Sequence, residues 1–294
     1  MRDTEKEGDK MKNTRNQPVN IPVEELRPFE GHPFKVKDDE EMNALIESVQ
    51  TQGILMPLIV RPIENTAEYE VISGHRRLHA AQKAGILEVP ALIYALDRDA
   101  AAIAVVDSNL HREHILPSEK AFAYKLKRDA MAHQGRTSPQ LGEKSLTVEK
   151  IGAEAGDSKN QVLRYIRLTH LIPELLDLMD EGKIALMVGE ALSYLGDKEQ
   201  YAVLEQCEMN DCTPSYAQAI EMKKRYQGIN LTVENISEIL SREKANQRET
   251  IKIPTEKLRK YAPNADAKQL EDFILKACEY YRKFLIRQRN RDER

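Results

Sequence analysis

The sequence predicts an α+β protein, with a small α/β domain first, an all-helical domain next and a helical region at the C-terminus. Three observations predict this order. Short β-branched runs alternate with helical apolar spacing up to residue 96, no strand pattern follows residue 98, and a glycine turn separates two amphipathic helices within residues 147–168. We expect four parts along the chain: a disordered arm at 1–20, the α/β domain at 21–98, a helical domain at 99–228 with a helix-turn-helix at 147–168, and the helical C-terminal region at 229–294.

The composition suits several small, well-solvated parts better than one large core. Of the 294 residues, 31% are charged, 5% are aromatic and none is tryptophan. The formal net charge is −4, so any nucleic-acid-binding surface must be a local basic patch. No run approaches the about 18 apolar residues of a membrane span, and the first 20 residues lack the apolar stretch of a signal peptide. We therefore expect a cytoplasmic protein with no membrane partner.

The cysteines argue against two kinds of site. There are three of them, Cys207, Cys212 and Cys278, an odd number without a C-x-x-C pair. This pattern is untypical of a disulfide framework or a zinc ribbon, and reduced cysteines are typical of a cytosolic protein. Because the first 206 residues contain no cysteine, a thiol mechanism in the α/β domain is excluded as well.

In the α/β domain, capping residues and prolines mark the ends of the elements. Asp38 or Asp39 can cap a helix that Gly53 ends, and the apolar residues within it follow helical spacing. Pro57 and Pro62 bound one β-rich run. The expected strands are Ile21–Leu26 as an edge strand, Leu58–Arg61, Tyr69–Ile72 and Val89–Leu96, and the expected helices are Asp38–Gly53 and His75–Ala84.

After residue 98 the pattern is helical with few interruptions. Pro117 opens a helix, a stretch with Gly, Pro and Ser at Gln134–Ser145 predicts a loop, and Gly228–Thr232 predicts a break. The final helix is amphipathic with a basic end, since residues 281–294 hold six Lys and Arg against two acids. The expected helices are Ala100–Asp107, Ser118–His133, a helical stretch from Thr147 to Tyr226, a polar helix at 233–247 and Lys268–Arg287, with an extended link at Ile251–Pro254 before the last.

The helix-turn-helix is predicted from its caps, its turn and its apolar spacing. Thr147 can cap the first helix, and Gly156 supplies the turn. Ser158 caps the second helix and forms a capping box with Gln161. The apolar residues predict a buried face on each helix, made of Val148, Ile151 and Ala155 on the first and Val162, Leu163 and Ile166 on the second.

The opposite face of the second helix carries residue types that read DNA bases in the major groove, where Asn and Gln pair with adenine and Arg pairs with guanine. Asn160, Gln161 and Arg164 point away from the buried face. Lys159 lies beside the helix N-terminus, where a DNA phosphate is favoured. The candidate DNA-binding residues are Ser158, Lys159, Asn160, Gln161, Arg164 and Tyr165. An ordinary helical hairpin with a solvated polar face is the alternative.

Two arginine-bearing turns form a candidate anion site. Val71–Arg77 has the pattern of a strand, a small-residue turn and a helix start, and backbone N–H groups at such a start bind anions. Ser108–Glu113 joins two helices and presents Asn109 and Arg112. Together the two turns could hold a polyphosphate, with Asn109 able to meet a hard cation. Salt-bridged surface arginines are the alternative, and the sequence has neither a P-loop nor a GxGxxG pattern.

The order of these segments resembles the ParB family of partition proteins, in particular those of plasmids and integrative conjugative elements. The matching stretches are Gln52–Val60, Ser73–Arg77, Asn109–Glu113 and Pro117–Ala121, followed by the helix-turn-helix. The resemblance implies a ParB/sulfiredoxin-like N-terminal domain that binds CTP and Mg2+, and a helix-turn-helix that binds a centromere-like site in double-stranded DNA. It further implies a homodimer that closes into a sliding clamp, a ParA-type ATPase as partner, and association with a nucleoid or plasmid.

The same resemblance implies roles for individual residues. The stretch from Gln52 would contact cytosine, the turn at Gly74 would hold phosphates, and Asn109 and Arg112 would serve magnesium and phosphate. The implied nucleotide-binding residues are Gln52, Gly53, Met56, Leu58, Ser73, Gly74, His75, Arg76, Arg77, Asn109 and Arg112, and the implied metal ligand is Asn109.

Two positions depart from the family's pattern. The family usually has Glu where this chain has His75, and another Glu, tied to CTP hydrolysis, where this chain has Ser108. A serine cannot act as a carboxylate base, so we expect nucleotide binding with very slow or absent hydrolysis. The C-terminal 60 residues do not clearly match the dimerisation domain of the chromosomal proteins. A helix-turn-helix transcriptional regulator without a partition role is the alternative function.

Overall fold

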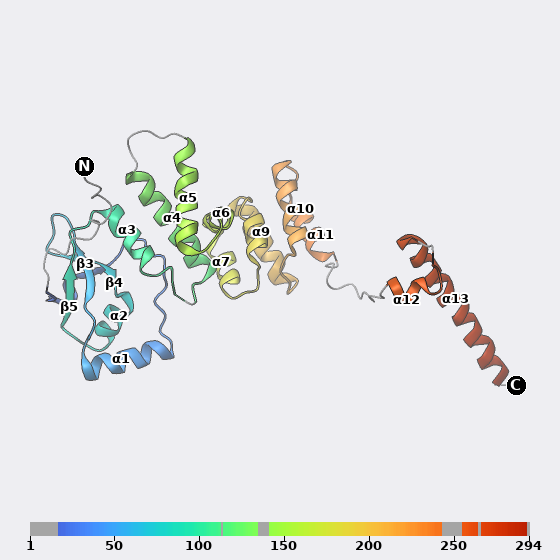
Figure 1. The fold of residues 1–294 in the computed structure, drawn as a ribbon, viewed down its shortest axis with the longest axis horizontal. Helices are drawn as coiled ribbons and strands as arrows, with labels where there is room; N and C mark the ends of the chain where they lie inside the picture. The colour runs from blue at the N-terminus through green and yellow to red at the C-terminus, as the bar shows by residue number, and fades with distance from the viewer. Residues whose placement is uncertain (1–16, 113, 135–140, 243–254, 264–265, 293–294) are drawn as a thin grey trace, which may run out of the picture. The chain divides into compact units, whose positions relative to one another are not determined.

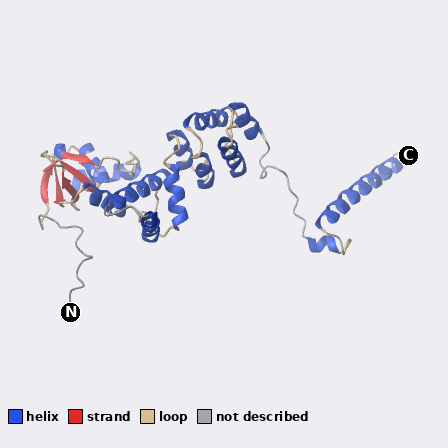
Figure 2. Ribbon diagram, turned by 90° about the horizontal axis from the view of Figure 1, so that it is seen from above, coloured by secondary structure: helices blue, strands red, loops and turns tan. Residues whose placement is uncertain are grey.

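The computed structural model describes residues 17–112, 114–134, 141–242, 255–263 and 266–292 (Figure 1). The chain forms two compact units, residues 1–242 and 243–294. In the first unit a small β-sheet precedes a series of helices, and the described part of the second unit is helical (Figure 2). The predicted α+β class is therefore confirmed. None of the helices described is long and apolar enough to cross a membrane.

A five-stranded sheet, ordered β1-β5-β3-β4-β2, forms the centre of the N-terminal part. Its strands are β1 (Val19–Pro22), β2 (Leu26–Pro28), β3 (Leu58–Pro62), β4 (Tyr69–Ser73) and β5 (Glu88–Ile93). β1 is antiparallel to β5 and β3 is antiparallel to β4, whereas the β3–β5 and β2–β4 pairs are parallel. Leu58 and Val60 from β3 and Val71 from β4, two of the three inner strands, are fully buried.

The single edge strand predicted at Ile21–Leu26 is wrong, because this stretch contributes to two strands. A 3-10 turn, η1 (Val23–Glu25), separates β1 from β2, which lie on opposite edges of the sheet. Pro22 fits there because an edge strand has free positions where a missing N–H breaks no ladder bond. β1 also begins at Val19, so residues 19–20 belong to the sheet and not to the predicted arm. Residues 1–16 of that arm lie outside the described residues.

The two helices of the sheet domain are α1 (Glu40–Gln52) and α2 (His75–Lys83), as predicted. Asp39 Oδ1 accepts a hydrogen bond from Met42 N–H at 2.8 Å, and Gly53 ends α1 with a φ of 70°. Met42 from α1 and Leu78 from α2 are buried in the core that the sheet forms with both helices. The predicted caps therefore place α1 correctly.

Helices alone follow in the described remainder of the first unit. They are α3 (Arg98–Asp107), α4 (Pro117–Gln134), α5 (Leu141–Ala155), α6 (Lys159–Leu168), α7 (Pro173–Asp180), α8 (Leu186–Leu192), α9 (Asp197–Met209), α10 (Tyr216–Gln227) and α11 (Val233–Ser241). The helical pattern predicted after residue 98 and the break at Gly228–Thr232 are confirmed.

The loop predicted at Gln134–Ser145 is wrong at both ends. α4 includes Gln134, and α5 begins at Leu141, so Thr147 lies inside a helix and does not cap one. A single glycine such as Gly142 costs about 1 kcal/mol relative to alanine in a helix, which tertiary packing can offset. Residues 135–140 lie outside the described residues.

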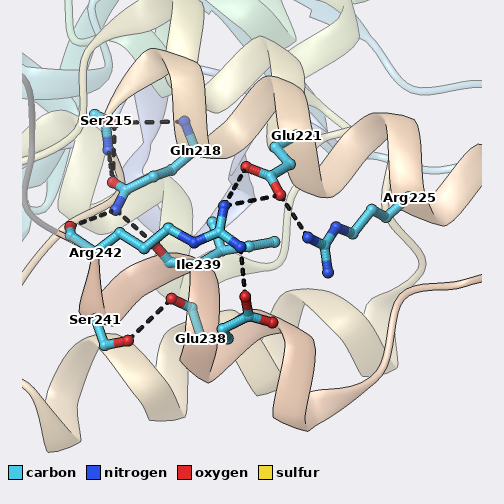
Figure 3. A network of polar contacts seen from close by, with 8 residues as sticks. All are labelled: Ser215, Gln218, Glu221, Arg225, Glu238, Ile239, Ser241 and Arg242. Carbon is cyan, nitrogen blue, oxygen red and sulfur yellow. Dashed lines mark hydrogen bonds and ion pairs between the residues drawn. The ribbon is translucent and has the colours of Figure 1, made fainter.

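A polar network joins α10 to α11 at the end of the first unit (Figure 3). Gln218 Nε2 donates to Ile239 O at 2.7 Å. The guanidinium of Arg242 binds both oxygens of Glu221 at 3.1 and 3.2 Å and also binds Glu238. These bonds fix the last described turn of the unit to the helix before it.

The helix predicted as polar at 233–247 is amphipathic instead. Ile236, Ile239 and Leu240 of α11 are buried in the core of the helical part, and the helix ends at Ser241. Three apolar residues at helical spacing are enough to form such a face even where polar residues surround them. Residues 243–247, together with the link predicted at Ile251–Pro254, lie outside the described residues.

The second unit contains α12 (Thr255–Arg259) and α13 (Ala267–Asp292). α13 confirms the helix predicted at Lys268–Arg287 and extends beyond it at both ends. Leu270 is buried, whereas four further apolar side chains are 40–61% exposed: Phe273, Tyr281, Phe284 and Leu285. The described part of this unit therefore leaves most of the apolar side of α13 uncovered.

The turn between α5 and α6 depends on two glycines. Gly156 has a φ of 73°, as its predicted place in the turn requires. Ser158 Oγ accepts from Gln161 N–H at 3.3 Å, but the reciprocal bond of the predicted capping box is not formed. A Cβ on Gly152 would lie 2.5 Å from Asp157 O, a contact that the sequence pattern does not reveal. The helix-turn-helix thus requires a glycine before the turn as well as in it.

We expect Gly152→Ala to destabilise the first unit by about 1–3 kcal/mol, the usual cost of overpacking a tight site. The added methyl group would press on a backbone oxygen, which cannot rotate away as a side chain can. Gly228→Ala is the matched control, because its Cβ would meet no atom closer than 3.5 Å. Urea unfolding followed by circular dichroism compares the two. A Gly152→Ala midpoint equal to that of the wild type would contradict this account.

Candidate functional site

A pocket of about 190 Å³ lies where three segments of the first unit meet. The segments are the loop between β2 and α1, the junction of β4 with α2, and the end of α3 with the residues that follow it. The lining residues are His32, Phe34, Lys35, Val36, Ser73, Gly74, His75, Arg76, Ser108, Asn109 and Arg112. The two arginine-bearing turns that the sequence predicts therefore line one pocket, to which the β2–α1 loop adds a third wall.

The first turn of α2 opens into this pocket without a side-chain cap. Gly74 precedes the helix with a φ of 107°, and a Cβ there would lie 3.0 Å from both Leu58 Cγ and Arg77 Nη2. Uncapped N–H groups and the positive end of the helix dipole favour an anion at such a place. Lys35, Arg76 and Arg112 add positive charge, and the lining contains no Asp or Glu.

Ser108 and Asn109 present few free polar atoms to the pocket. Asn109 Nδ2 and Ser108 Oγ both donate to Val105 O, at 2.9 and 3.0 Å. Asn109 Oδ1 accepts from Arg112 Nη1 at 3.4 Å, so the amide oxygen faces a cation. Among the residues described, no group of three His, Cys, Asp or Glu side chains could hold a metal ion. This set of donors fits an anion and does not fit a resident divalent cation.

Five candidate nucleotide-binding residues lie outside the lining: Gln52, Gly53, Met56, Leu58 and Arg77. Arg77 Nη1 instead donates to the main-chain oxygens of Met56 and Pro57, and burial lowers the pKa of its guanidinium. Leu58 is fully buried, whereas Met56 is 72% exposed. The stretch from Gln52 to Leu58 thus reaches the pocket indirectly, through the packing of Leu58 and Arg77 beside Gly74.

His32, which the sequence did not predict, packs its ring against that of the predicted residue His75 in the wall of the pocket. The rings of His32 and His75 have centroids 3.7 Å apart. His75 Nε2 accepts from Phe29 N–H at 3.3 Å, and His32 Nδ1 pairs with Phe34 O at 2.8 Å. Burial, with a smaller effect of the neighbouring His32, lowers the pKa of His75 to about 3. Burial also lowers the pKa of His32. Both rings are therefore neutral at pH 7, and His75 adds no charge to the pocket.

The exposed face of α6 carries Asn160 and Arg164, two of the predicted base-reading residues. Asn160 is exposed, and Arg164 and Lys159 make ion pairs with Glu190 and Glu149 at 3.2 and 2.9 Å. Leu163, predicted in the buried face, is 44% exposed. It is wrong as a core residue because Val162 and Ile166 already fill the contact with α4 and α5, and Leu163 lies at the edge of the face that they form.

Tyr165 is held inside the helical part. Its ring meets that of Tyr124 edge-on at 5.9 Å, and Lys120 Nζ lies 4.9 Å from its centroid. Tyr124 OH in turn donates to Asp157 Oδ2 at 2.6 Å, next to the turn. The structure therefore gives Tyr165 a packing role between α4 and α6.

Further cations, not singled out in the sequence, gather at the end of α6. Arg167 Nη2 donates to Ser193 O at 2.7 Å, and its guanidinium stacks 4.2 Å from the ring centroid of Tyr194. Burial, followed by the charges of Arg167, Lys125 and Arg128, lowers the pKa of His170. Lys and Arg side chains grouped beside a helix of this kind form a local basic patch suited to phosphates.

The pKa of His75 predicts a loss of stability in acid. The pKa of His75 is 6.5 in its ordinary state and about 3 in the folded chain. Between these pH values the unfolded chain binds a proton at His75 and the folded chain does not. We expect the His75 contribution to be complete above about pH 6.5 and to fade as the pH falls toward 3. Urea midpoints measured at pH 7, 5 and 4 should fall more steeply for the wild type than for His75→Gln. Parallel curves would rule out the neutral, buried imidazole.

Comparison with known proteins identifies the N-terminal part. Residues 6–110 match the sequence model of the ParB N-terminal domain. The chain is 33% identical over 183 residues to the chromosome-partitioning protein Spo0J of Thermus thermophilus, covering 62% of each chain. It is 32% identical over 196 residues to the nucleoid occlusion protein of Geobacillus thermodenitrificans, covering 66% of this chain and 64% of that one. The chain thus spans less than two thirds of the length of either relative.

Two solved structures of the C-terminally truncated ParB of Caulobacter crescentus are also similar. Its complex with the centromeric parS site is 25% identical and covers 70% of this chain and 99% of that chain, with a TM-score of 0.41. Its complex with CTP-gamma-S is 28% identical and covers 64% and 97%, with a TM-score of 0.31. The matched domain and the two sequence relatives lead to one conclusion: the chain contains a ParB N-terminal domain and is similar in sequence to chromosome-partitioning and nucleoid occlusion proteins.

Proposed function

We propose that the chain is a ParB-type partition protein that binds CTP in the pocket and a centromere-like site in double-stranded DNA through α6. The observation that carries the proposal is the meeting of the two arginine-bearing turns at the uncapped start of α2. In this role it acts in the cytoplasm, on nucleoid or plasmid DNA, as a homodimer with a ParA-type ATPase. Its cargo is a plasmid, a mobile element or a chromosome.

The charges around the pocket support a polyphosphate ligand. Arg76 Nη2 lies 3.2 Å from Glu41 Oε2 and 3.8 Å from Asp39 Oδ1. Glu41 is 81% exposed, and such surface pairs are worth about 0–1 kcal/mol, so a more highly charged phosphate can replace them. We propose Mg2+ only as a companion of bound phosphates, since Asn109 is the one amide in the lining and no carboxylate joins it.

The face of α6 supports DNA as the second ligand. Arg164 pairs with Glu190 on α8 at a distance of 3.2 Å and keeps 41% of its side chain exposed. This partner can orient the guanidinium in the free protein and release it to a guanine edge. Arg167 and the cations beside it would meet the phosphates on either side of the groove.

A second function has one observation in its favour. The relative from Geobacillus thermodenitrificans is called a nucleoid occlusion protein and is nearly as similar as the partition protein from Thermus thermophilus. A DNA-binding regulator without a partition role therefore remains the alternative. Stimulation of a ParA-type ATPase by the purified chain separates the two, because partition requires it and the alternative does not.

We expect isothermal calorimetry to detect CTP binding, and Arg76→Ala to weaken it by about tenfold or more. Hydrogen bonds to charged groups contribute about 1.5–3 kcal/mol, and about 1.4 kcal/mol is a factor of ten. Arg27→Ala is the matched control, because Arg27 is an exposed arginine paired with Glu68 outside the pocket lining. Absence of CTP binding to the wild type, or an equal loss in both variants, would refute the site.

Hydrolysis of CTP should be very slow or absent, because Ser108 stands where a carboxylate base would act. General-base assistance typically contributes about 10²–10⁴-fold, so its absence should be visible. Phosphate release in the presence of specific DNA should remain near background for the wild type and rise for Ser108→Glu. Robust release by the unmodified protein would show that another residue performs this role.

Arg164→Ala should weaken binding to the cognate DNA site more than binding to a scrambled duplex. A good bidentate base contact discriminates by about 1–3 kcal/mol. Arg225→Ala is the control, since Arg225 is also a helical arginine paired with a glutamate, on α10. Fluorescence anisotropy at fixed salt measures both duplexes. Equal loss on the two would indicate a phosphate contact, and no loss would remove Arg164 from the interface.

We expect the apolar side of α13 to hold the proposed homodimer together. Deleting residues 251–294, or replacing Phe284 and Leu285 with serine in the full chain, should shift the solution mass toward the monomer. Burying an apolar side chain is worth about 1.5–3 kcal/mol, so two losses should suffice. Lys276→Ala on the same helix is the control. Analytical ultracentrifugation showing an unchanged dimer would place self-association elsewhere.

A further inference from the structure

Lys35 belongs to two sites at once. It lines the pocket together with its neighbours in the β2–α1 loop. Its ammonium nevertheless lies against α7, with Nζ 3.2 Å from Asp177 Oδ1 and 3.2 Å from Asp180 Oδ2. The Lys35 side chain is 48% exposed and therefore has room to move.

The junction around Lys35 keeps its carboxylates satisfied without the ammonium. Asp180 accepts from Ser118 N–H at 2.9 Å and from Ser118 Oγ at 2.6 Å, and only 8% of its side chain is exposed. Glu119 accepts from Lys35 N–H at 2.7 Å, which ties the loop backbone to the first turn of α4. Asp177 is 63% exposed and can turn to water. Withdrawal of the Lys35 ammonium would leave Asp180 without an ionic partner, but its two hydrogen bonds from Ser118 at the start of α4 would remain.

The competing attractions favour a phosphate when one is present. Partial burial opposes the charge on Lys35, but the hydrogen bonds to Asp177 and Asp180 raise its pKa overall, so the group is a full cation. The Lys35–Asp177 pair is exposed on both sides, and such pairs are weak. A polyphosphate in the pocket would carry several negative charges and would already be held by the start of α2 and by Arg76 and Arg112.

We propose that Lys35 is a further phosphate-binding residue, and that a polyphosphate in the pocket draws its ammonium away from Asp177 and Asp180. Pocket occupancy then loosens the link between the β2–α1 loop and α7, the helix that follows α6. The inference rests on the proposed nucleotide site and adds a residue and a coupling to it. By thermodynamic reciprocity, weakening the aspartate side must strengthen the phosphate side.

The test measures binding of CTP and of inorganic tripolyphosphate by calorimetry at fixed salt. Lys35→Met should weaken both ligands by about tenfold or more. Asp177→Asn should tighten both by about two- to fivefold, because it removes a competitor for the ammonium. Glu174→Gln is the matched control: it makes the same change of charge on the same helix, and Glu174 lies outside the pocket lining.

The double variant Lys35→Met, Asp177→Asn separates a direct competition from a general effect of charge. The gain from Asp177→Asn should vanish in this background, since the shared ammonium is gone. A gain that persists, a gain equal to that of Glu174→Gln, or unchanged binding by Lys35→Met would each overturn the inference. Binding of tripolyphosphate with these effects but not of CTP would refute the proposed CTP specificity while supporting the role of Lys35. Binding of neither ligand by the wild type would overturn both.

Discussion

The left-handed backbone at Gly74 determines where the first turn of α2 can present its N–H groups. The residue is confined on one side by Leu58, which is fully buried, and on the other by Arg77, which holds the loop at Met56 and Pro57. Any side chain at this position would have to displace one of them. The remainder of the pocket follows from this placement, because the β2–α1 loop and the end of α3 meet at the same uncapped helix start.

Carboxylates lie around the pocket and not in its lining, and several of them tie it to the helical part. Lys127 is almost completely buried and binds Asp107, at the end of α3, and Glu154, in the first helix of the helix-turn-helix. A buried lysine is tolerated when it is paired in this way, and removing one partner is costly. Together with the Lys35–Asp180 contact, this network joins the wall of the pocket to the helices that carry the candidate DNA-binding face.

The sequence predicted what depends on local spacing and missed what depends on packing. Capping residues and glycines predicted the first helix of the sheet domain and the turn at Gly156, and the two arginine-bearing turns line one pocket, as expected. The loop at 32–36 has neither helical nor strand periodicity, so its sequence did not predict that it lines the pocket. Gly152 is required because Asp157 O packs close to its Cα. Leu163 is exposed because Val162 and Ile166 fill the contact of α6 with α4 and α5. Each of these facts requires the tertiary structure.

Backbone amide shifts test most directly whether a nucleotide binds at the start of α2. In a titration of the ¹⁵N-labelled chain with CTP, the amide signals of His75, Arg76 and Arg77 should move together with the side-chain amide of Asn109. The amides of α9, which contributes nothing to the pocket lining, should remain in place. A titration that moves α9 or α13 and leaves the three amides at the start of α2 unshifted would contradict the account.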